Sequence, residues 1–187
     1  RVKPGAAIGM DGVFNMQPFY AKGGFKFSHR DLRMEGVATK MDYDDKVSKV
    51  EPGDFDLFSQ MDKECFGFDR TKFLKGWLNL DDSSAFKYVD DSGLKGFGVI
   101  RKCVKGYKIG PLFADNYQVA DELFKALSST VVGELVYLDI PEIHKDAVKL
   151  AASYSMKECF GCARMYYGKA PNLPYNRIFG VTTFELG

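Results

Sequence analysis

Two carboxylates flank the end of a nearly continuous apolar run in the sequence. The run is Gly133–Ile140, and Asp139 and Glu142 lie on either side of Ile140 and Pro141. A carboxylate at the end of a buried strand can act as a general base that takes a proton from a substrate. Alternatively, Asp139 or Glu142 caps the helix expected beyond Pro141, as acidic residues often do. The pattern therefore indicates a candidate base and leaves the capping role open.

A second candidate site is the strand, turn and helix predicted for Gly106–Leu127. Its apolar beginning, which includes Tyr107 and Phe113, leads through a short polar turn into apolar residues at helical spacing. Such a turn directs the free N–H groups of the helix toward the carboxyl end of the strand, where phosphate-bearing ligands bind. The stretch predicts an anion site.

Other reactive side chains are scattered along the chain. Asp62 and Arg70 lie on two successive helical patterns, where they could bind an acceptor molecule or form a structural ion pair. His29 and His144 are the two histidines, and neither has a cluster of ligand residues near it in the sequence. We expect His144, in the first turn of a helix, to have an ordinary polar surface role.

The four cysteines, Cys65, Cys103, Cys159 and Cys162, indicate reduced thiols in a cytoplasmic compartment. Cys159 and Cys162 have half of a zinc spacing, but no second pair or suitable histidine completes it. Free thiols are expected, with redox activity as the alternative. No metal site is predicted.

Length and composition exclude several classes of function. The chain has 187 residues, of which 45% are hydrophobic and 27% charged, as in a soluble globular protein with one full core and an appended piece. A net charge of +1 gives no electrostatic basis for binding nucleic acid or an anionic membrane. No apolar run reaches the roughly 18 residues of a membrane span. Because the first residue is Arg1, we expect the chain to begin inside a longer protein.

The elements that must position these candidates follow an α+β order. Hydrophobic periodicity and turn residues predict strand, two helices, three strands, helix, strand, helix and two strands. The predicted ranges are Val47–Val50, Asp54–Phe66, Arg70–Leu78, Ala85–Val89, Leu94–Val104, Tyr107–Phe113, Val119–Leu127, Gly133–Ile140, Ile143–Tyr154, Met156–Tyr167 and Arg177–Glu185. The opening residues, Arg1–Gly36, predict a short helix through Met16, Phe19 and Tyr20 that Gly23 ends, then a strand at Phe25–Met34, with Pro18 shifting the start of the helix or kinking it.

This order, together with KIGPLFADN, LDIPE, ARMYYG and the ending TTFELG, resembles the GNAT superfamily of acyl-CoA-dependent N-acyltransferases. The chain is most similar to the C-terminal unit of tandem GNAT proteins. The resemblance implies a complete GNAT-like domain at residues 39–187 and, at residues 1–38, the helix-strand tail of a preceding unit, to which FYAKGGFKF is similar. It also implies a mixed, mostly antiparallel sheet with a splayed strand pair and helices on both faces.

The resemblance implies a cofactor site for acetyl-CoA or CoA. In the superfamily the pantetheine arm lies against the exposed backbone of the strand before the turn, and the amides of the turn hold the diphosphate. Carried over by position, the binding residues are Ile109, Gly110, Pro111, Leu112, Phe113, Asn116, Tyr117, Gln118, Val119 and Ala120.

Two residues of the turn depart from the pattern of the superfamily. Asp115 stands where a basic or amide residue belongs, and Gln118 replaces the first glycine, whereas Ala120 fits the last position. A carboxylate about 6 Å from a diphosphate charge costs on the order of 3 kcal/mol at an effective dielectric constant of ~20. Asp115 and Gln118 also have the spacing of a capping box, which would occupy the amides that CoA needs.

The resemblance also implies a tyrosine near the end of the helix after the splayed strands, where it can protonate the leaving thiolate. That position is Ala151 here, and Tyr154 lies three residues later; the matching residue of the opening piece is Tyr20. The catalytic candidates are therefore Tyr20, Asp139, Glu142 and Tyr154.

Two functions follow as hypotheses. The first is an N-acyltransferase that moves an acyl group, most simply acetyl, directly from CoA to a primary amine, with strand amides polarising the thioester carbonyl. The second is a catalytically silent GNAT-like module that binds a ligand or completes the pocket of a preceding unit. Loss of the turn glycine and of the expected tyrosine favours the second. The preceding unit and a second copy of the chain are possible partners.

Overall fold

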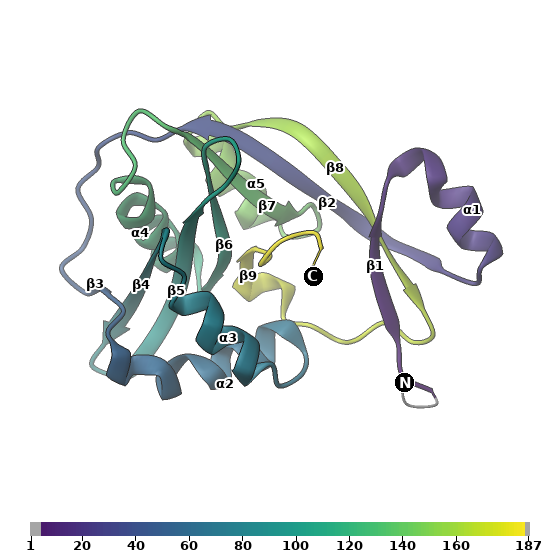
Figure 1. The fold of residues 1–187 in the computed structure, drawn as a ribbon, viewed down its shortest axis with the longest axis horizontal. Coiled ribbons are helices and arrows are strands. Elements are labelled where there is room, and N and C mark those ends of the chain that lie inside the picture. The colour runs from purple at the N-terminus through teal and green to yellow at the C-terminus, as the bar shows by residue number, and fades with distance from the viewer. Residues whose placement is uncertain (1–4, 186–187) are drawn as a thin grey trace.

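The computed structural model describes residues 5–185, and its centre is one mixed sheet (Figure 1). Eight strands follow the order β1-β8-β2-β7-β6-β5-β4-β3, and β9 pairs with β6 beside this path. All neighbours are antiparallel except β6 and β7. The strands are β1 (Ile8–Gly12), β2 (Lys26–Val37), β3 (Val47–Lys49), β4 (Ser83–Asp90), β5 (Gly93–Lys102), β6 (Tyr107–Ala114), β7 (Leu135–Pro141), β8 (Lys157–Tyr167) and β9 (Ile178–Gly180).

The parallel pair at the centre of the sheet is paired at one end only. Tyr107–Ile109 of β6 faces Val136–Leu138 of β7, and the two strands separate beyond these positions. Every residue of β6 after Tyr107 is buried, as its apolar residues predict; Lys108 is the charged residue among them, and it pairs with Asp139. We call the gap between Gly110–Ala114 of β6 and Asp139–Pro141 of β7 the splay. The predicted splayed strand pair is present.

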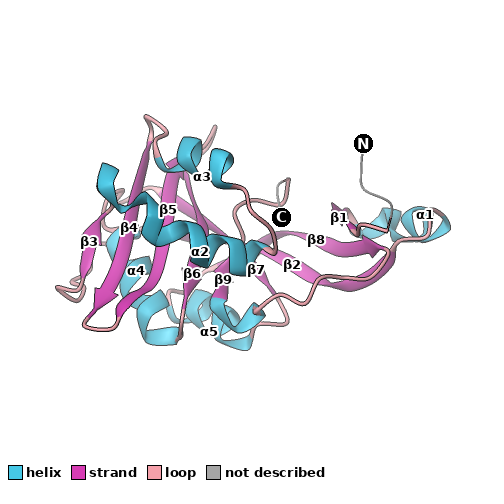
Figure 2. Ribbon diagram, turned by 90° about the horizontal axis from the view of Figure 1, so that it is seen from below, coloured by secondary structure: helices cyan, strands magenta, loops and turns pink. Residues whose placement is uncertain are grey.

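Helices cover both faces of the sheet (Figure 2). The pair α2 (Phe55–Phe66) and α3 (Thr71–Leu78) lies on one face, and α4 (Tyr117–Ser128) with α5 (Lys145–Ser153) lies on the other. Gly67, with φ +96°, ends α2 in the left-handed region that favours glycine. Short 3₁₀ turns at Phe14–Met16, Pro52–Asp54 and Tyr175–Arg177 precede α1 (Gln17–Lys22), α2 and β9.

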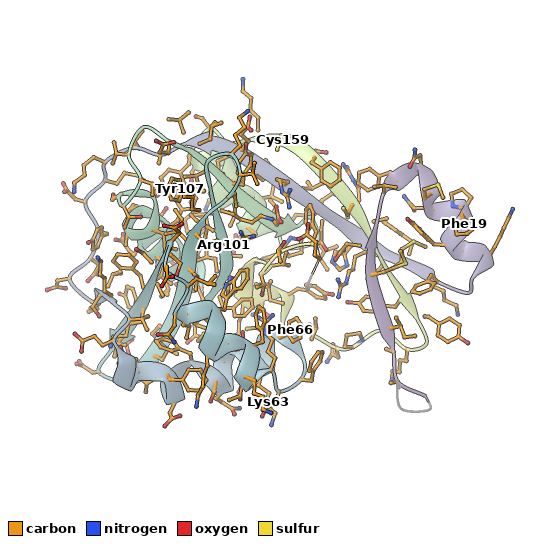
Figure 3. All side chains as sticks on the ribbon, viewed as in Figure 1. Phe19, Lys63, Phe66, Arg101, Tyr107 and Cys159 are labelled. Atoms are coloured by element: carbon orange, nitrogen blue, oxygen red, sulfur yellow. The ribbon has the colours of Figure 1, made fainter. Side chains whose placement is uncertain are left out.

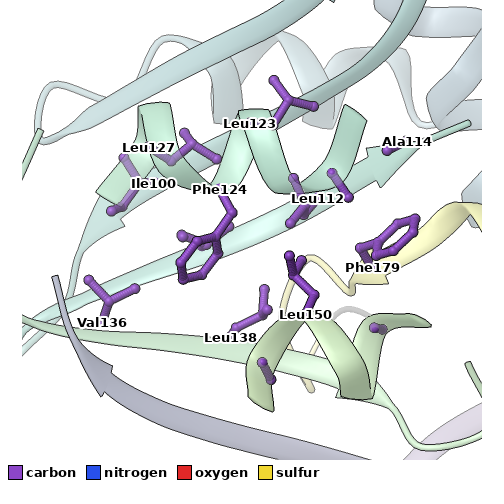
Figure 4. Packing of buried hydrophobic residues seen from close by; sticks show 14 of the residues in the cluster. Ile100, Leu112, Ala114, Leu123, Phe124, Leu127, Val136, Leu138, Leu150 and Phe179 are labelled. Carbon is purple, nitrogen blue, oxygen red and sulfur yellow. The ribbon is translucent and has the colours of Figure 1, made fainter. Parts of the chain in front are cut away.

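The main hydrophobic core lies between the sheet and the helices α4 and α5 (Figure 4). Leu123, Phe124 and Leu127 of α4 pack with Leu138 of β7 and Leu150 of α5, and all five side chains are almost fully buried. A second core joins α2 and α3 to the other face through Phe58, Met61, Cys65, Leu74, Phe97, Phe113 and Ile178. The two cores fix the carboxyl end of β6 between them.

Strands β1, β8 and β2 extend away from the helices as a ribbon (Figure 1). Within it β8 lies between β1 and β2, and β2 also pairs with β7 over Asp31–Val37. The opening residues therefore lie inside the sheet. α1 lies at the far end of the ribbon, where Pro18 occupies the first turn and Gly23 follows the last residue. The helix therefore begins next to Pro18 and ends before Gly23, as predicted for both residues.

The predicted elements from residue 47 to residue 167 are all present, with boundaries that differ by a few residues. Two predictions at the ends of the chain are wrong. Ile8–Gly12 forms β1, although no strand was predicted there. The strand predicted at Arg177–Glu185 is only β9, Ile178–Gly180, because Thr182 and Thr183 turn away to bond with side chains of other elements. No helix in residues 5–185 is long and apolar enough to cross a membrane.

Candidate functional site

The splay is filled by the protein's own backbone. β9 lies antiparallel to β6, with Leu112 opposite Gly180 and Phe113 opposite Ile178. On the other side, the Val181 N–H donates to the carbonyl oxygen of Asp139 in β7 at 2.9 Å. We call residues 178–182 the closing segment. It bridges both strands of the splay and covers the part of the β6 backbone that the family resemblance implied to be exposed (Figure 1).

Close backbone packing accompanies this arrangement at Gly110. A Cβ atom there would lie 2.6 Å from the carbonyl oxygen of Val181 and would also collide with that of Thr182. The Gly110 carbonyl oxygen accepts a hydrogen bond from Trp77 Nε1 at 2.9 Å. At position 110 only glycine, which has no Cβ atom, allows the closing segment to pack this closely on β6.

Side chains at the starts of α3 and α5 hold the closing segment. Arg70 donates to Thr182 Oγ1 at 2.8 Å while it makes two hydrogen bonds of 2.8 and 2.7 Å to the carboxylate of Asp62. Both charged side chains are buried, so Asp62 and Arg70 form a structural ion pair. His144 Nδ1 donates to the carbonyl oxygen of Ile178 at 2.9 Å. His144 is only 8% exposed, so the prediction that it lies on the surface is wrong.

The turn before α4 uses its amides internally. Asn116 is the N-cap residue, and its Oδ1 accepts from the Val119 N–H at 3.1 Å. The Ala120 N–H donates to the Asn116 carbonyl. The predicted Asp115–Gln118 capping box is therefore wrong. Asp115 instead pairs with Arg177 at 2.8 Å, because its carboxylate points toward the loop before β9.

Asp139, one of the candidate bases, is fully buried between two cations. Its carboxylate accepts two hydrogen bonds from Arg33, at 2.7 and 2.9 Å, and lies 2.5 Å from Lys108 Nζ. Bonding to this carboxylate raises the pKa of Arg33 above its ordinary value. The Phe184 ring lies beneath both cations. The Asp139 carboxylate of β7 therefore joins that strand to β2 through Arg33 and to β6 through Lys108.

The other catalytic candidates each contact different partners from those of Asp139. Glu142 is on the surface, paired with Arg30 at 3.3 Å. Tyr154 donates to Asp121 Oδ1 at 2.6 Å between α5 and α4, and burial together with this carboxylate raises its pKa. Tyr20 lies on α1 at the far end of the ribbon, packed on Gly12. The chain does not gather these four side chains into one site.

A separate cavity of about 220 Å³ lies between the ribbon and the end of α2. Its apolar wall contains Phe66, Phe68, Phe113, Leu173 and Ile178. Phe66 extends from the inner side of α2, while Lys63, less than one turn earlier, points outward (Figure 3). The closing segment contributes Ile178 and Val181, so the cavity adjoins the filled splay.

The ribbon gives this cavity a polar wall. His29 and Asp31 of β2, with Arg164 and Tyr166 of β8, line it, and Tyr175 stands opposite, with its ring 5.0 Å from that of His29. These side chains share a face because residues two apart on a strand point the same way. Burial and the neighbouring Tyr166 raise the pKa of Tyr175 above its ordinary value.

Behind this wall lies a charged group that the sequence did not reveal. Asp11 of β1 accepts a hydrogen bond from Arg164 at 2.6 Å, and its side chain is 2% exposed. Burial, with a smaller contribution from Asp31, raises the pKa of Asp11 to about 7 despite the opposing effect of Arg164. His29 and Asp31 lie two residues apart in a predicted strand, and this spacing could have indicated that both face the cavity. Nothing in the sequence indicated Asp11, because no strand was predicted around it.

The cysteines occupy positions that favour free thiols. Cys159 and Cys162 are three residues apart on β8, so their side chains face opposite sides of the strand, one exposed and one buried. All four cysteines are free. Burial raises the pKa of Cys65 to about 12 and that of Cys162 to about 11. In residues 5–185 no group of three or more His, Cys, Asp or Glu side chains could hold a metal ion.

Comparison with known proteins agrees with this architecture. Residues 58–180 match the family described as acetyltransferase (GNAT) domain. The chain is 29% identical over 183 residues to holothin acyltransferase from Pseudoalteromonas sp. (strain SANK 73390), covering 97% of this chain and 62% of that protein. Thus the chain spans about three fifths of the length of this relative.

Two solved structures share the fold. A candidate acetyltransferase from Pyrococcus horikoshii superposes with a TM-score of 0.81 at 24% identity, over 97% of this chain and 60% of that one. A GCN5-related N-acetyltransferase from Sphaerobacter thermophilus gives 0.63 at 11% identity, over 91% and 62%. At these identities the likeness extends to the fold alone.

Proposed function

The chain belongs to the GNAT acetyltransferase family, and from this premise we propose that it is the module of an acyl-CoA-dependent N-acyltransferase that does not itself hold the acyl-CoA. In this proposal the whole protein transfers an acyl group, most simply acetyl, to a primary amine. The acyl-CoA is bound by a further unit, and the present chain shapes the acceptor side.

The observation that carries the proposal is the closing segment in the splay. A pantetheine arm needs free N–H and C=O groups on β6, but β9 pairs with Leu112 and Phe113. Removing the closing segment would break its contacts with Asp139 and Arg70 and uncover the buried Phe179. Exposing one such side chain costs about 1.5–3 kcal/mol. Acyl-CoA would have to offset this cost before it gained any contact.

The turn before α4 supports the same proposal. Asn116 and the first helical hydrogen bond already occupy the Val119 and Ala120 amides. Asp115 adds a negative charge at the entrance to the turn, paired with Arg177 at 2.8 Å and with Lys95 at 4.0 Å. A diphosphate at this turn would have to displace the acceptors of the Val119 and Ala120 amides, and it would be repelled by the Asp115 carboxylate.

Gln118→Glu in the full-length protein tests the proposal. Gln118 is exposed in the first turn of α4, where an added carboxylate leaves the fold intact and interacts favourably with the helix dipole. If the diphosphate bound at this turn, the new charge would raise the KM for acetyl-CoA more than tenfold, since about 3 kcal/mol of repulsion acts at ~6 Å. We expect the KM to stay within twofold of wild type.

Steady-state release of CoA in the presence of an amine measures that KM, with Gln118→Ala as the neutral control. A rise in KM for Gln118→Glu alone would place acyl-CoA in this chain and contradict the proposal. Absence of amine-dependent CoA release from the full-length wild-type protein, over a panel of primary amines, would contradict the proposed transfer itself.

A further inference from the structure

Two buried carboxyl groups of the ribbon meet across β8. Asp11 of β1 lies opposite Arg164, and Asp31 of β2 lies opposite Cys162, two residues earlier on the same face of β8. The two carboxyl groups share a side-chain hydrogen bond. The side chain of Asp11 is 2% exposed and that of Asp31 is 4% exposed. Water therefore has almost no access to either group.

A hydrogen bond between two carboxyl groups requires a proton on one of them, because ionised carboxylates only accept. Within residues 5–185, no N–H or O–H group of another side chain or of the backbone donates to Asp11 Oδ1 or to Asp31 Oδ1. Asp11 Oδ2 accepts from Arg164 at 2.6 Å, which leaves Oδ1 for the bond to Asp31. One proton shared by the pair supplies the missing donor, whereas two ionised groups would repel each other.

One guanidinium group, that of Arg164, is the fixed positive charge beside the pair. His29 Nε2 lies 3.4 Å from Asp31 Oδ1 and is charged only when the ring takes up a proton. Arg33, the next residue on this face of β2, is bonded to Asp139. The other titratable side chains near the pair are thiols and phenols, which are uncharged at neutral pH: Cys162 and Tyr166 of β8, Cys65 of α2 and Tyr175 of the turn before β9.

β1 has few other contacts that could hold it in place. It is the edge strand of the sheet and pairs with β8 alone. Ile8 is 41% exposed and Met10 is half-buried, whereas the Asp11 side chain is almost fully buried. The side chain that β1 buries most deeply is therefore an ionisable one.

We propose that Asp11 and Asp31 share one proton and form a pH-sensitive latch that holds β1 on the sheet. When this proton leaves to solvent, the two carboxylates repel each other, and β1 separates from β8 so that Asp11 becomes hydrated. Ala7 and Gly9 line the cavity between the ribbon and α2, and the separation of β1 therefore opens the cavity on that side. The inference is independent of the proposed acyl transfer.

The latch is closed in acid and loosens as the pH rises. Burial raises the pKa of Asp11 to about 7, while Arg164 opposes this effect and Asp31 adds to it. In the released strand the carboxyl group is hydrated and has its ordinary pKa of about 4. Between these two values the closed strand binds a proton that the released strand does not, so the equilibrium constant for release rises by up to about tenfold for each pH unit. Above about pH 7 both forms are ionised, and the constant levels off.

Amide hydrogen exchange of the 187-residue chain between pH 5 and pH 7 measures the release of β1. Protection factors, which are corrected for the intrinsic pH dependence of exchange, report how often a bonded amide becomes free. We expect the β1 amides bonded to β8 to lose about tenfold of their protection for each pH unit. At pH 7 they should be at least tenfold less protected than the amides of Val136–Leu138 in the centre of the sheet. NMR titration of the side-chain carboxyl carbons should show one proton leaving the pair near pH 7.

Asp11→Asn makes the donor permanent, because the new amide nitrogen can donate to Asp31 while its oxygen still accepts from Arg164. The protection of β1 in this variant should stay high and lose its pH dependence. Asp146→Asn, at an exposed position of α5, serves as the matched control and should keep the wild-type profile. His29→Gln should also keep that profile, because the proton belongs to the carboxyl pair.

Four results would each overturn the inference: no pH dependence of β1 protection in the wild type, an unchanged dependence in Asp11→Asn, its loss in His29→Gln, or two carboxyl groups that both ionise at about pH 4. Equal protection of β1 and Val136–Leu138 would show that β1 does not separate on its own, and would overturn it too. Circular dichroism verifies that the variants are folded. If Asp11→Asn does not fold, Asp31→Asn gives the same test, because its amide can donate to Asp11 Oδ1.

Discussion

The splay and the neighbouring cavity differ in how their polar groups are satisfied. In the splay, the backbone of β6 is paired with β9, and the Asp139 carboxylate is held by Arg33 and Lys108. In the cavity, two buried carboxylate oxygens lack a donor within the described residues. A region whose groups are all bonded gains little from a ligand, whereas unpaired groups gain a partner on binding. The comparison shows that the polar groups of the splay are bonded within the protein, whereas the wall of the cavity holds two buried carboxyl groups, Asp11 and Asp31, close together.

The largest expected effect comes from removing one charge of the buried pair that anchors the closing segment. Arg70→Met leaves Asp62 without a partner in an environment where its side chain is 2% exposed, and it removes the bond to Thr182. Breaking a buried ion pair in this way costs about 3–5 kcal/mol. Urea denaturation of the variant should show a loss of that size in the free energy of unfolding.

The double variant Asp62→Leu with Arg70→Met is its control. It removes both charges and keeps apolar volume, so most of the lost stability should return. A single Arg70→Met variant as stable as wild type would mean that this pair does not hold the segment in the splay.

Two glycine substitutions separate the filled splay from an open surface. Gly110→Ala places a Cβ atom against the carbonyl oxygens of Val181 and Thr182, and overpacking of this kind costs about 1–3 kcal/mol. Gly76→Ala, in α3, meets no atom within 4 Å and should stabilise the chain by about 0.5–1 kcal/mol. Thermal unfolding of the two variants should therefore shift in opposite directions. A stabilising Gly110→Ala would contradict the close packing of the closing segment.

The smallest effect is expected at the turn before α4. Asn116→Ala removes the hydrogen bond to the Val119 N–H, and loss of such a cap costs about 1 kcal/mol. Gln118→Ala, in the same turn, should change the free energy of unfolding by less than half as much. Chemical denaturation of both variants compares them directly. Equal effects would show that the amide of Val119 is not engaged by Asn116.

The sequence predicted what depends on local pattern and missed what depends on distant contacts. The apolar runs of β6 and β7 and the periodicity of α4 were sufficient to predict these elements and the family resemblance. The buried His144 was predicted to be exposed, because nothing near it in the sequence indicates that β9 returns to accept its hydrogen bond. Asp11 and Arg164 are 153 positions apart, and only the pairing of β1 with β8 brings them together.

The turn before α4 illustrates the same limit. Asp115 and Gln118 have the spacing of a capping box, but Asn116 has an equally suitable side chain and takes the position. Asp115 pairs with Arg177 at 2.8 Å instead, and nothing near Asp115 in the sequence indicates this contact. A local motif therefore predicted that the helix is capped and failed to identify the residue that caps it.

The most direct test of the central claim is titration of the 187-residue chain with acetyl-CoA in a calorimeter, with thermal unfolding measured in parallel. Because the closing segment fills the splay, we expect no heat of binding and no shift of the melting temperature. A ligand at 100 times its Kd stabilises a protein by about 2.7 kcal/mol, which is a shift of roughly 5–11 °C for a domain of this size. A shift in that range that Gln118→Glu abolishes would show that acyl-CoA enters the splay and would contradict the account.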